Sequence, residues 1–192
     1  APGATLYFAY IEGSSISLAN MVDWLIEEEV DIVSYSATFL VSPMDGTGFA
    51  VNAVKDAPAA GILWANSSGN YAESHILETF KDTDGDGFHE FQDGSELLAY
   101  EAWGPAALGF SWADNWSGPG IDLDLFVYSD SQGQNLVVSS TDEQSGLSSQ
   151  WPAEFINYYF DYDTYYIAIQ NLNPGTNPRM NLLSNAGLFG YS

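Results

Sequence analysis

The sequence predicts two parts, an α/β parallel-sheet unit over residues 1–80 and an antiparallel, jelly-roll-like β-sandwich over residues 81–192. Two observations predict this division. Apolar strands alternate with helical stripes in the first part, which is the order of parallel strand–helix–strand units. After Phe80 the helical periodicity disappears, and short strands recur every ~10 residues between turns rich in Gly, Pro, Asn and Asp.

The first part is expected to hold three strands and two helices. Residues 5–11 carry apolar and aromatic side chains on both faces, as a strand of a covered parallel sheet does. A helical stripe follows, formed by Leu18, Met21, Val22, Leu25 and Ile26. The expected elements are a strand at 5–11, a helix at 17–29, a strand at 31–36, a helix at 48–57 and a strand at 61–65.

The second part is expected to hold seven short strands. Their spacing and the turn residues between them are typical of an antiparallel sandwich. The expected ranges are 97–103, 106–112, 123–128, 136–139, 154–159, 164–170 and 179–183.

The charge of the chain narrows the range of partners. Its 192 residues include 26 Asp and Glu against 3 Lys and Arg, for a formal net charge of -23. Such a surface repels nucleic acid and anionic lipid, so we expect neither a nucleic-acid partner nor a membrane. It suits divalent cations or cationic peptides. The alternative interpretation is solubility in an extracellular or saline setting.

Other features concern location and completeness. The chain has no cysteine, which excludes disulfides and thiolate chemistry but is compatible with secretion, since calcium can stabilise a secreted domain instead. We therefore expect an extracellular location. The abrupt opening on Ala1, Pro2 and Gly3 predicts a fragment of a longer protein. A partial parallel sheet would leave its edges exposed, which favours self-association.

An acidic loop over residues 82–93 has the spacing of an EF-hand-like calcium loop, with Gly87 at its sixth position. Oxygen ligands are expected at positions one, three, five, seven, nine and twelve. They are the carboxylates of Asp82, Asp84, Asp86, Glu90 and Asp93 and the carbonyl of Phe88. Ca²⁺ is the expected cofactor, and the alternative is a solvated acidic turn.

Two further groups in the second part admit two interpretations each. Asp122 and Asp124 could bind a second calcium or lie on a solvent-exposed strand face. The abundant aromatic residues could form a carbohydrate-binding face or fill the sandwich core. They are Trp112, Trp116, Tyr128, Trp151, Tyr158, Tyr159, Tyr165 and Tyr166.

The first part resembles the subtilisin-like serine peptidases. The resemblance rests on the Ala1-Pro2-Gly3-Ala4 opening, the strand ending at Ser36, Gly46-Thr47-Gly48 before a helix, and the Ser68-Gly69-Asn70 turn. Beyond this turn the chain is similar to a subgroup of secreted subtilases with an inserted β-domain. That similarity rests on Tyr71-Ala72-Glu73-Ser74-His75, the acidic loop and Asp122-Leu123-Asp124-Leu125.

The resemblance implies a fragment of a subtilisin-like fold, cut from between the catalytic His and Ser of a secreted serine endopeptidase. It implies that Asn70 donates to an oxyanion. It also implies that a polypeptide substrate binds along Ser36, Ala37, Thr38, Ser68 and Gly69. Asn70 could instead cap a turn.

The chain departs from the family pattern in two respects. The catalytic triad is absent, so the chain alone is expected to be inactive, and neither His75 nor His89 lies at a His-Gly-Thr helix start. Ser36-Ala37-Thr38 stands where Ser-x-Gly is usual. The alternatives are a non-catalytic, calcium-stabilised protein- or glycan-binding module and a degenerate peptidase relative.

Overall fold

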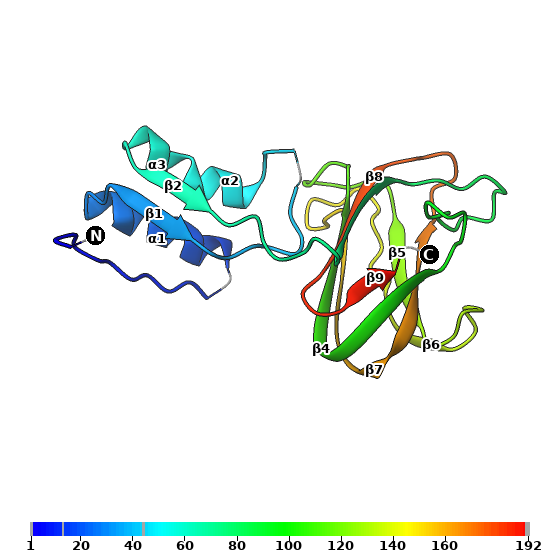
Figure 1. Cartoon of the computed structure of the whole chain (residues 1–192). Helices are drawn as coiled ribbons and strands as arrows, with labels where there is room; N and C mark the ends of the chain where they lie inside the picture. The colour runs from blue at the N-terminus through cyan, green and yellow to red at the C-terminus, as the bar shows by residue number, and fades with distance from the viewer. Residues whose placement is uncertain (1, 13, 44, 191–192) are drawn as a thin grey trace. The chain divides into compact units, whose positions relative to one another are not determined.

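The computed structural model describes residues 2–12, 14–43 and 45–190, so that Ala1, Gly13, Met44, Tyr191 and Ser192 of the predicted parts lie outside it. The chain divides into two compact units (Figure 1). Unit 1 comprises Ala1–Thr38 and Met44–Gly69, and unit 2 comprises Phe39–Pro43 and Asn70–Ser192.

Unit 1 consists of short helices and a two-stranded parallel sheet. In chain order its elements are α1 (Ser15–Glu27), β1 (Ile32–Tyr35), α2 (Phe49–Val54), α3 (Asp56–Ala59) and β2 (Leu63–Asn66). The predicted apolar stripe of α1 is buried at Leu18, Val22 and Leu25. None of the helices in the described part of the chain has the length and apolar character needed to cross a membrane.

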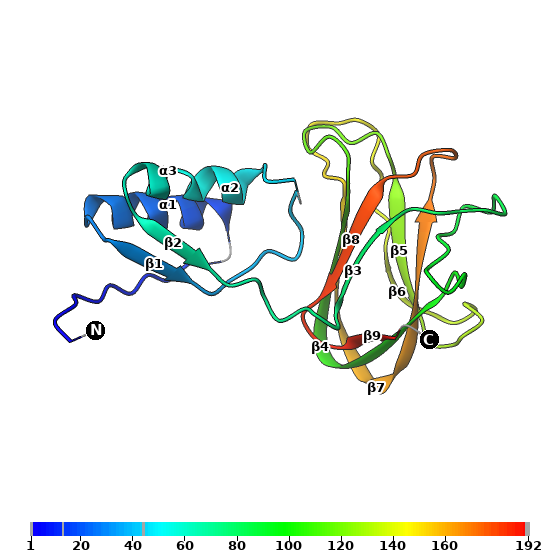
Figure 2. The ribbon, with the colours of Figure 1, turned by 45° about the horizontal axis from the view of Figure 1, so that its top comes forward.

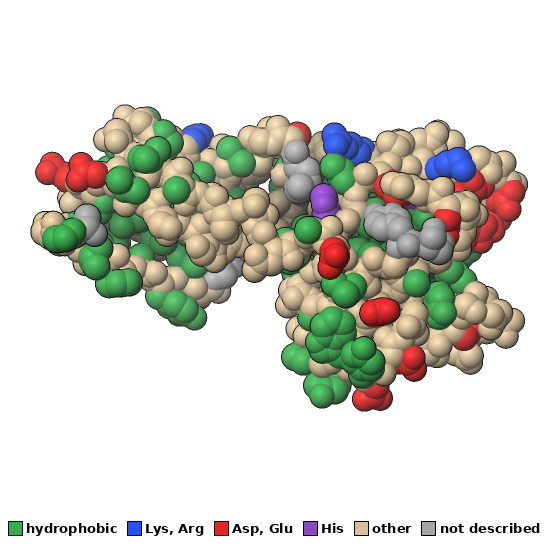
Figure 3. All heavy atoms as spheres, in the orientation of Figure 1, with side chains coloured by type: hydrophobic (Ala, Val, Ile, Leu, Met, Phe, Trp, Pro, Cys, Tyr) green, Lys and Arg blue, Asp and Glu red, His purple; other side chains and the backbone are tan. Residues whose placement is uncertain are grey.

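The prediction of a three-stranded parallel α/β sheet is wrong. Residues 5–11 belong to no strand, and Leu6, Phe8 and Tyr10 are exposed. Figure 3 shows such hydrophobic side chains on the surface of unit 1. An apolar segment becomes a strand only where a neighbour takes up its backbone N–H and C=O groups, and here none of the described strands does so. Unit 1 therefore lacks the parallel α/β core of a subtilisin-like fold.

Unit 2 is an antiparallel β-sandwich, which confirms that part of the predicted fold (Figure 2). The strand order is β3-β8-β4-β7-β5-β6, and β9 also pairs with β4. The strands are β3 (His75–Thr79), β4 (Leu98–Trp112), β5 (Leu123–Tyr128), β6 (Leu136–Ser140), β7 (Ala153–Asn171), β8 (Arg179–Ser184) and β9 (Leu188–Gly190).

Two long bent strands run through both layers of the sandwich. β4 and β7 pair along almost their whole length, with a register shift between Ala102 and Gly104. Gly104 has a φ of 67°, and Pro105 follows it. The bulge and the left-handed glycine bend the ribbon without interrupting it. Each of two predicted strand pairs, 97–103 with 106–112 and 154–159 with 164–170, is therefore one continuous strand.

The core of unit 2 lies between the layers formed by this ribbon. Its largest fully buried side chains are Tyr100, Leu108, Phe110, Leu123, Leu125, Ile156, Phe160, Ile167, Ile169 and Leu182. Gly109 points to the other face of β4, where an added Cβ would lie 2.5 Å from the Leu40 carbonyl oxygen. The short segment Phe39–Pro43 therefore packs against β4 at a position that only glycine can occupy.

Candidate functional site

The acidic loop is fastened to the end of β7. The His89 N–H donates to the Ile169 carbonyl at 2.9 Å, and the Asn171 N–H donates to the Gly87 carbonyl at 2.8 Å. These two bonds flank an antiparallel bridge between Phe88 and Gln170. The sandwich thus holds the loop at one point, and the aspartates precede that point.

Three of the predicted ligands converge. Asp82, Asp84 and Asp86 each offer a carboxylate oxygen, and these oxygens lie within 4.8 Å of one another. The Asp82 carboxylate accepts the N–H groups of Gly85 at 2.7 Å and Gly87 at 3.0 Å. Both glycines have positive φ, which lets the backbone curl around the carboxylate.

The other predicted carboxylates are not part of this group. Glu90 accepts hydrogen bonds from the Lys81 ammonium and from the backbone and hydroxyl of Thr83. These hydrogen bonds, of which the one from Lys81 has the largest effect, lower the pKa of Glu90 to about 2. Asp93 accepts the Ser95 N–H at 2.9 Å. The Phe88 carbonyl points away from β7, because the bonds of the bridge are made by its neighbours Gly87 and His89.

The predicted substrate segments in unit 1 lie at one edge of its sheet. Because β1 and β2 are parallel, their C-terminal ends meet, and the Ser67 N–H donates to the Tyr35 carbonyl at 3.0 Å. Ser36–Thr38 and Ser68–Gly69 follow these ends. Asn70 is exposed and begins the second stretch of unit 2.

Both histidines are bonded to polar side chains of unit 2. His75 Nε2 lies 2.8 Å from Asn181 Oδ1. His89 is buried, with Nε2 3.1 Å from Glu78 Oε2 and with Nδ1 accepting the Lys81 N–H at 3.0 Å. Burial lowers the pKa of His89. Its neutral ring is therefore part of the support beneath the acidic loop.

The predicted aromatic set divides by burial. Trp112 and Tyr165 are buried in the sandwich, as the core interpretation predicted for them. Trp116, Tyr128 and Tyr166 are half-buried. Of this set, Trp151, Tyr158 and Tyr159 are exposed and can offer a ring to a ligand.

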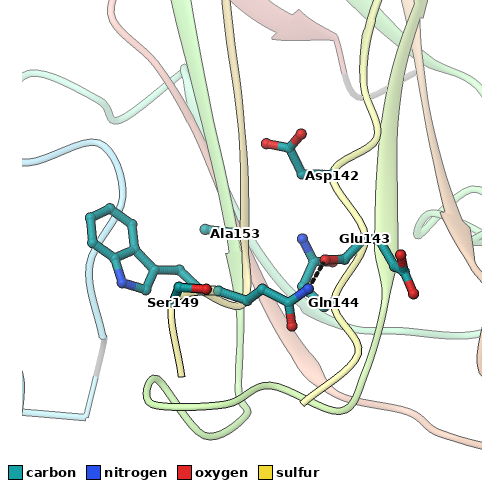
Figure 4. A pocket seen from close by; sticks show the side chains of 7 residues that line it. Asp142, Glu143, Gln144, Ser149 and Ala153 are labelled. Carbon is teal, nitrogen blue, oxygen red and sulfur yellow. Dashed lines mark hydrogen bonds between the residues drawn. The ribbon is translucent and has the colours of Figure 1, made fainter. Parts of the chain in front are cut away.

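Trp151 lies at an open pocket between β6 and β7. The pocket has a volume of about 320 Å³ and is lined by Asp142, Glu143, Gln144, Ser149, Gln150, Trp151 and Ala153 (Figure 4). The Gln150 amide shapes it by accepting the N–H groups of Ser145 and Leu147, both at 2.9 Å. The Trp151 side chain remains 58% exposed.

A buried carboxylate beneath this pocket was missed by sequence reasoning. Glu154 accepts the Ser140 hydroxyl, the Asp142 N–H at 3.0 Å and the Gln144 side-chain amide at 3.0 Å. Burial raises its pKa to about 7, although these hydrogen bonds act in the opposite direction. The available signal was an acidic residue at an inward-facing position of a β-strand.

Asp124 is also buried, at 7% exposure, rather than on a solvent-exposed face. Its burial raises its pKa to about 6, and the neighbouring Asp122 carboxylate adds to the rise. Burial likewise raises the pKa of Asp122.

No protein-family model matches this chain, and no curated protein does. Solved structures resemble it weakly. The pre-peptidase C-terminal domain of a collagenase from Bacillus anthracis is 12% identical, with a TM-score of 0.40 over 59% of this chain and 89% of that one. The CBM35 from Cellvibrio japonicus Abf62 is 14% identical, with a TM-score of 0.31 over 61% of this chain and all of that one.

The resemblance to the subtilisin-like serine peptidases is wrong. No model of that family matches, and the parallel sheet of the described residues has only two strands. The prediction that the parent protein is a serine-protease hydrolase is wrong for the same reasons. The oxyanion role of Asn70 and the substrate role of Ser36–Thr38, Ser68 and Gly69 depended on that resemblance.

Proposed function

We propose that this chain is a non-catalytic binding module whose β-sandwich is stabilised by Ca²⁺. The observation that carries the proposal is the convergence of Asp82, Asp84 and Asp86 within 4.8 Å. Three carboxylates so close together repel one another unless a cation lies between them. Calcium prefers such hard oxygen ligands.

The residues present fit this ion. Calcium takes about six to eight oxygen ligands. Three carboxylates and the Phe88 carbonyl can supply several of them, and water can supply more. A bound ion would join the first half of the loop, which carries Asp82, Asp84 and Asp86, to the bridge with β7. A calcium-stabilised module without cysteines suits an extracellular location.

Thermal unfolding with calcium and with chelator tests this proposal. Calcium should raise the melting temperature of the unmutated chain, because a ligand that binds only the folded state stabilises it. Asp84→Ala with Asp86→Ala should reduce the difference by the share that the loop contributes. Asp161→Ala with Asp163→Ala removes the same charge from exposed positions and should preserve it. An unmutated chain with the same melting temperature in both solutions would contradict the proposal.

The Trp151 pocket supports glycan binding as the activity of the module. An exposed indole offers an apolar platform to a sugar ring. The carboxylates of Asp142 and Glu143 and the Ser149 hydroxyl have no hydrogen-bond partner among the described residues, so they are available to sugar hydroxyl groups. A pocket of this volume is within the range of small-ligand sites.

Retention on a panel of immobilised polysaccharides tests the pocket. Trp151→Ala should abolish retention without lowering the melting temperature, whereas Trp103→Ala, another exposed tryptophan of unit 2, should leave it unchanged. A cationic peptide is the competing ligand, since Asp142 and Glu143 would attract it. If the chain binds only such a peptide, and if high salt abolishes that binding, glycan binding is refuted.

A further inference from the structure

Two neighbouring carboxylates at the start of β5, the half-buried Asp122 and the buried Asp124, have no ion pair among the described residues. Along β5 the side chains of Leu123, Leu125 and Val127 enter the core, so Asp124 lies on the opposite face, with Asp122 two residues before it. Asp124 is nevertheless almost fully buried. Its carboxylate has no hydrogen bond or ion pair among the described residues.

Two side-chain oxygen atoms at the start of β5 and in the loop after β6 are buried without a hydrogen-bond partner. One is Asp122 Oδ1 and the other is Gln144 Oε1. Gln144 approaches Asp122 closely enough for its backbone N–H to interact with that carboxylate. Its side-chain nitrogen donates to Glu154 at 3.0 Å, which fixes the amide and leaves the oxygen unpaired. Gln144 is itself 4% exposed.

A buried oxygen acceptor without a donor is costly, and a buried negative charge is more costly still. Asp122 Oδ1 and Gln144 Oε1 are two such acceptors, and the Asp124 carboxylate lies close enough to Asp122 for the two charges to repel each other. Carboxylate and amide oxygens are the ligands that a hard divalent cation prefers. A cation would supply the missing partner to all three at once.

We propose that Asp122, Asp124 and the Gln144 side-chain oxygen form a second calcium site, independent of the acidic loop. Water would complete the coordination. The site would tie the start of β5 to the loop that follows β6, and that loop carries one wall of the Trp151 pocket.

The number of Ca²⁺ ions bound per chain, measured by isothermal titration, tests this proposal. The unmutated chain should bind two. Asp122→Asn with Asp124→Asn, which keeps the side-chain shapes, should bind one, and so should Asp84→Ala with Asp86→Ala. The chain with all four substitutions should bind none. Asp161→Asn with Asp163→Asn, at exposed carboxylates outside both sites, is the matched control and should bind two.

Different results would refute the loop site and the second site. If Asp122→Asn with Asp124→Asn binds as many ions as the unmutated chain, the second site is refuted, whatever the loop does. If Asp84→Ala with Asp86→Ala loses no ion while the Asn pair does, the loop site fails and the second site stands. Circular dichroism of each variant confirms folding. If the Asp122→Asn, Asp124→Asn variant does not fold, Asp124→Asn alone takes its place. It should lower the calcium affinity of the second site at least tenfold, and an unchanged affinity would refute that site.

Discussion

The two units bury their apolar residues to very different extents. Unit 2 encloses a continuous core in which Leu108, Phe110 and Leu125 are fully buried. Among its described residues unit 1 has only two paired strands, and one face of them is open, since Ile32 and Leu63 lie opposite each other at 65% and 63% exposure. A bent ribbon can close a core by folding over itself, whereas a two-stranded parallel sheet cannot.

The largest change in stability is expected when an aromatic ring is removed from the closed core of unit 2. Phe110→Ala should lower the free energy of unfolding of unit 2 by about 3–5 kcal/mol, because it leaves a cavity that the sandwich cannot fill. Denaturant unfolding followed by tryptophan fluorescence measures it. Phe155→Ala, the same change at an exposed position of β7, should cost far less. Equal effects would mean that the core is not closed.

Gly109→Ala tests whether the short segment around Leu40 belongs to the sandwich. The new Cβ would lie 2.5 Å from the Leu40 carbonyl oxygen, so either the segment or β4 must move. We expect a loss of about 1–3 kcal/mol in unfolding free energy. Gly120→Ala, where an added Cβ meets nothing within 4 Å, is the control. Similar stabilities of the two variants would show that the segment does not pack against β4.

The pH dependence of stability should differ between the units because of Glu154. Its pKa is about 7 in the folded chain against an ordinary value of 4.5, so the folded state binds the proton more tightly. Its contribution to stability is complete below pH 4.5 and is lost as pH rises through about 7. Glu154→Gln should flatten the fall in melting temperature over this window. An unchanged slope would exclude Glu154 as its cause.

The smallest expected effect concerns the open face of unit 1. Ile32→Ser with Leu63→Ser should change stability little, because both side chains are largely exposed. If exposed sheet surface drives self-association, the pair should lower the average mass in sedimentation velocity. Leu136→Ser with Leu147→Ser, at exposed positions of unit 2, is the control. The interpretation fails if both pairs behave alike.

The periodicity of the chain predicted the sandwich and most of its strands, but it could not show how strands continue. Gly104, Pro105 and Asp161–Asp163 are typical turn residues, yet Ala102 pairs with Asp163 inside one ribbon. β3 was not predicted, because Ile76, Leu77, Glu78 and Thr79 do not alternate between apolar and polar side chains. Its partner β8 lies about a hundred residues further along the chain. Long-range pairing overrode the local signal in both cases.

The candidate sites show the same limit. Spacing predicted the three aspartates, because ligands two residues apart on one loop have little freedom. It could not predict that Lys81 and Thr83 would hold Glu90. The burial of Asp124 and Glu154 depends on chain segments that cross them from elsewhere.

The excursion of Phe39–Pro43 gives the chain an interleaved order. The polypeptide passes from unit 1 to unit 2, returns, and passes over again after Gly69. Neither unit is therefore a single contiguous stretch of sequence, and no single cut can separate them cleanly. A protease that cleaved after Gly69 would leave Leu40, which packs against Gly109, on the N-terminal fragment. The two products would stay associated through that segment, or the C-terminal one would carry an uncovered patch on β4.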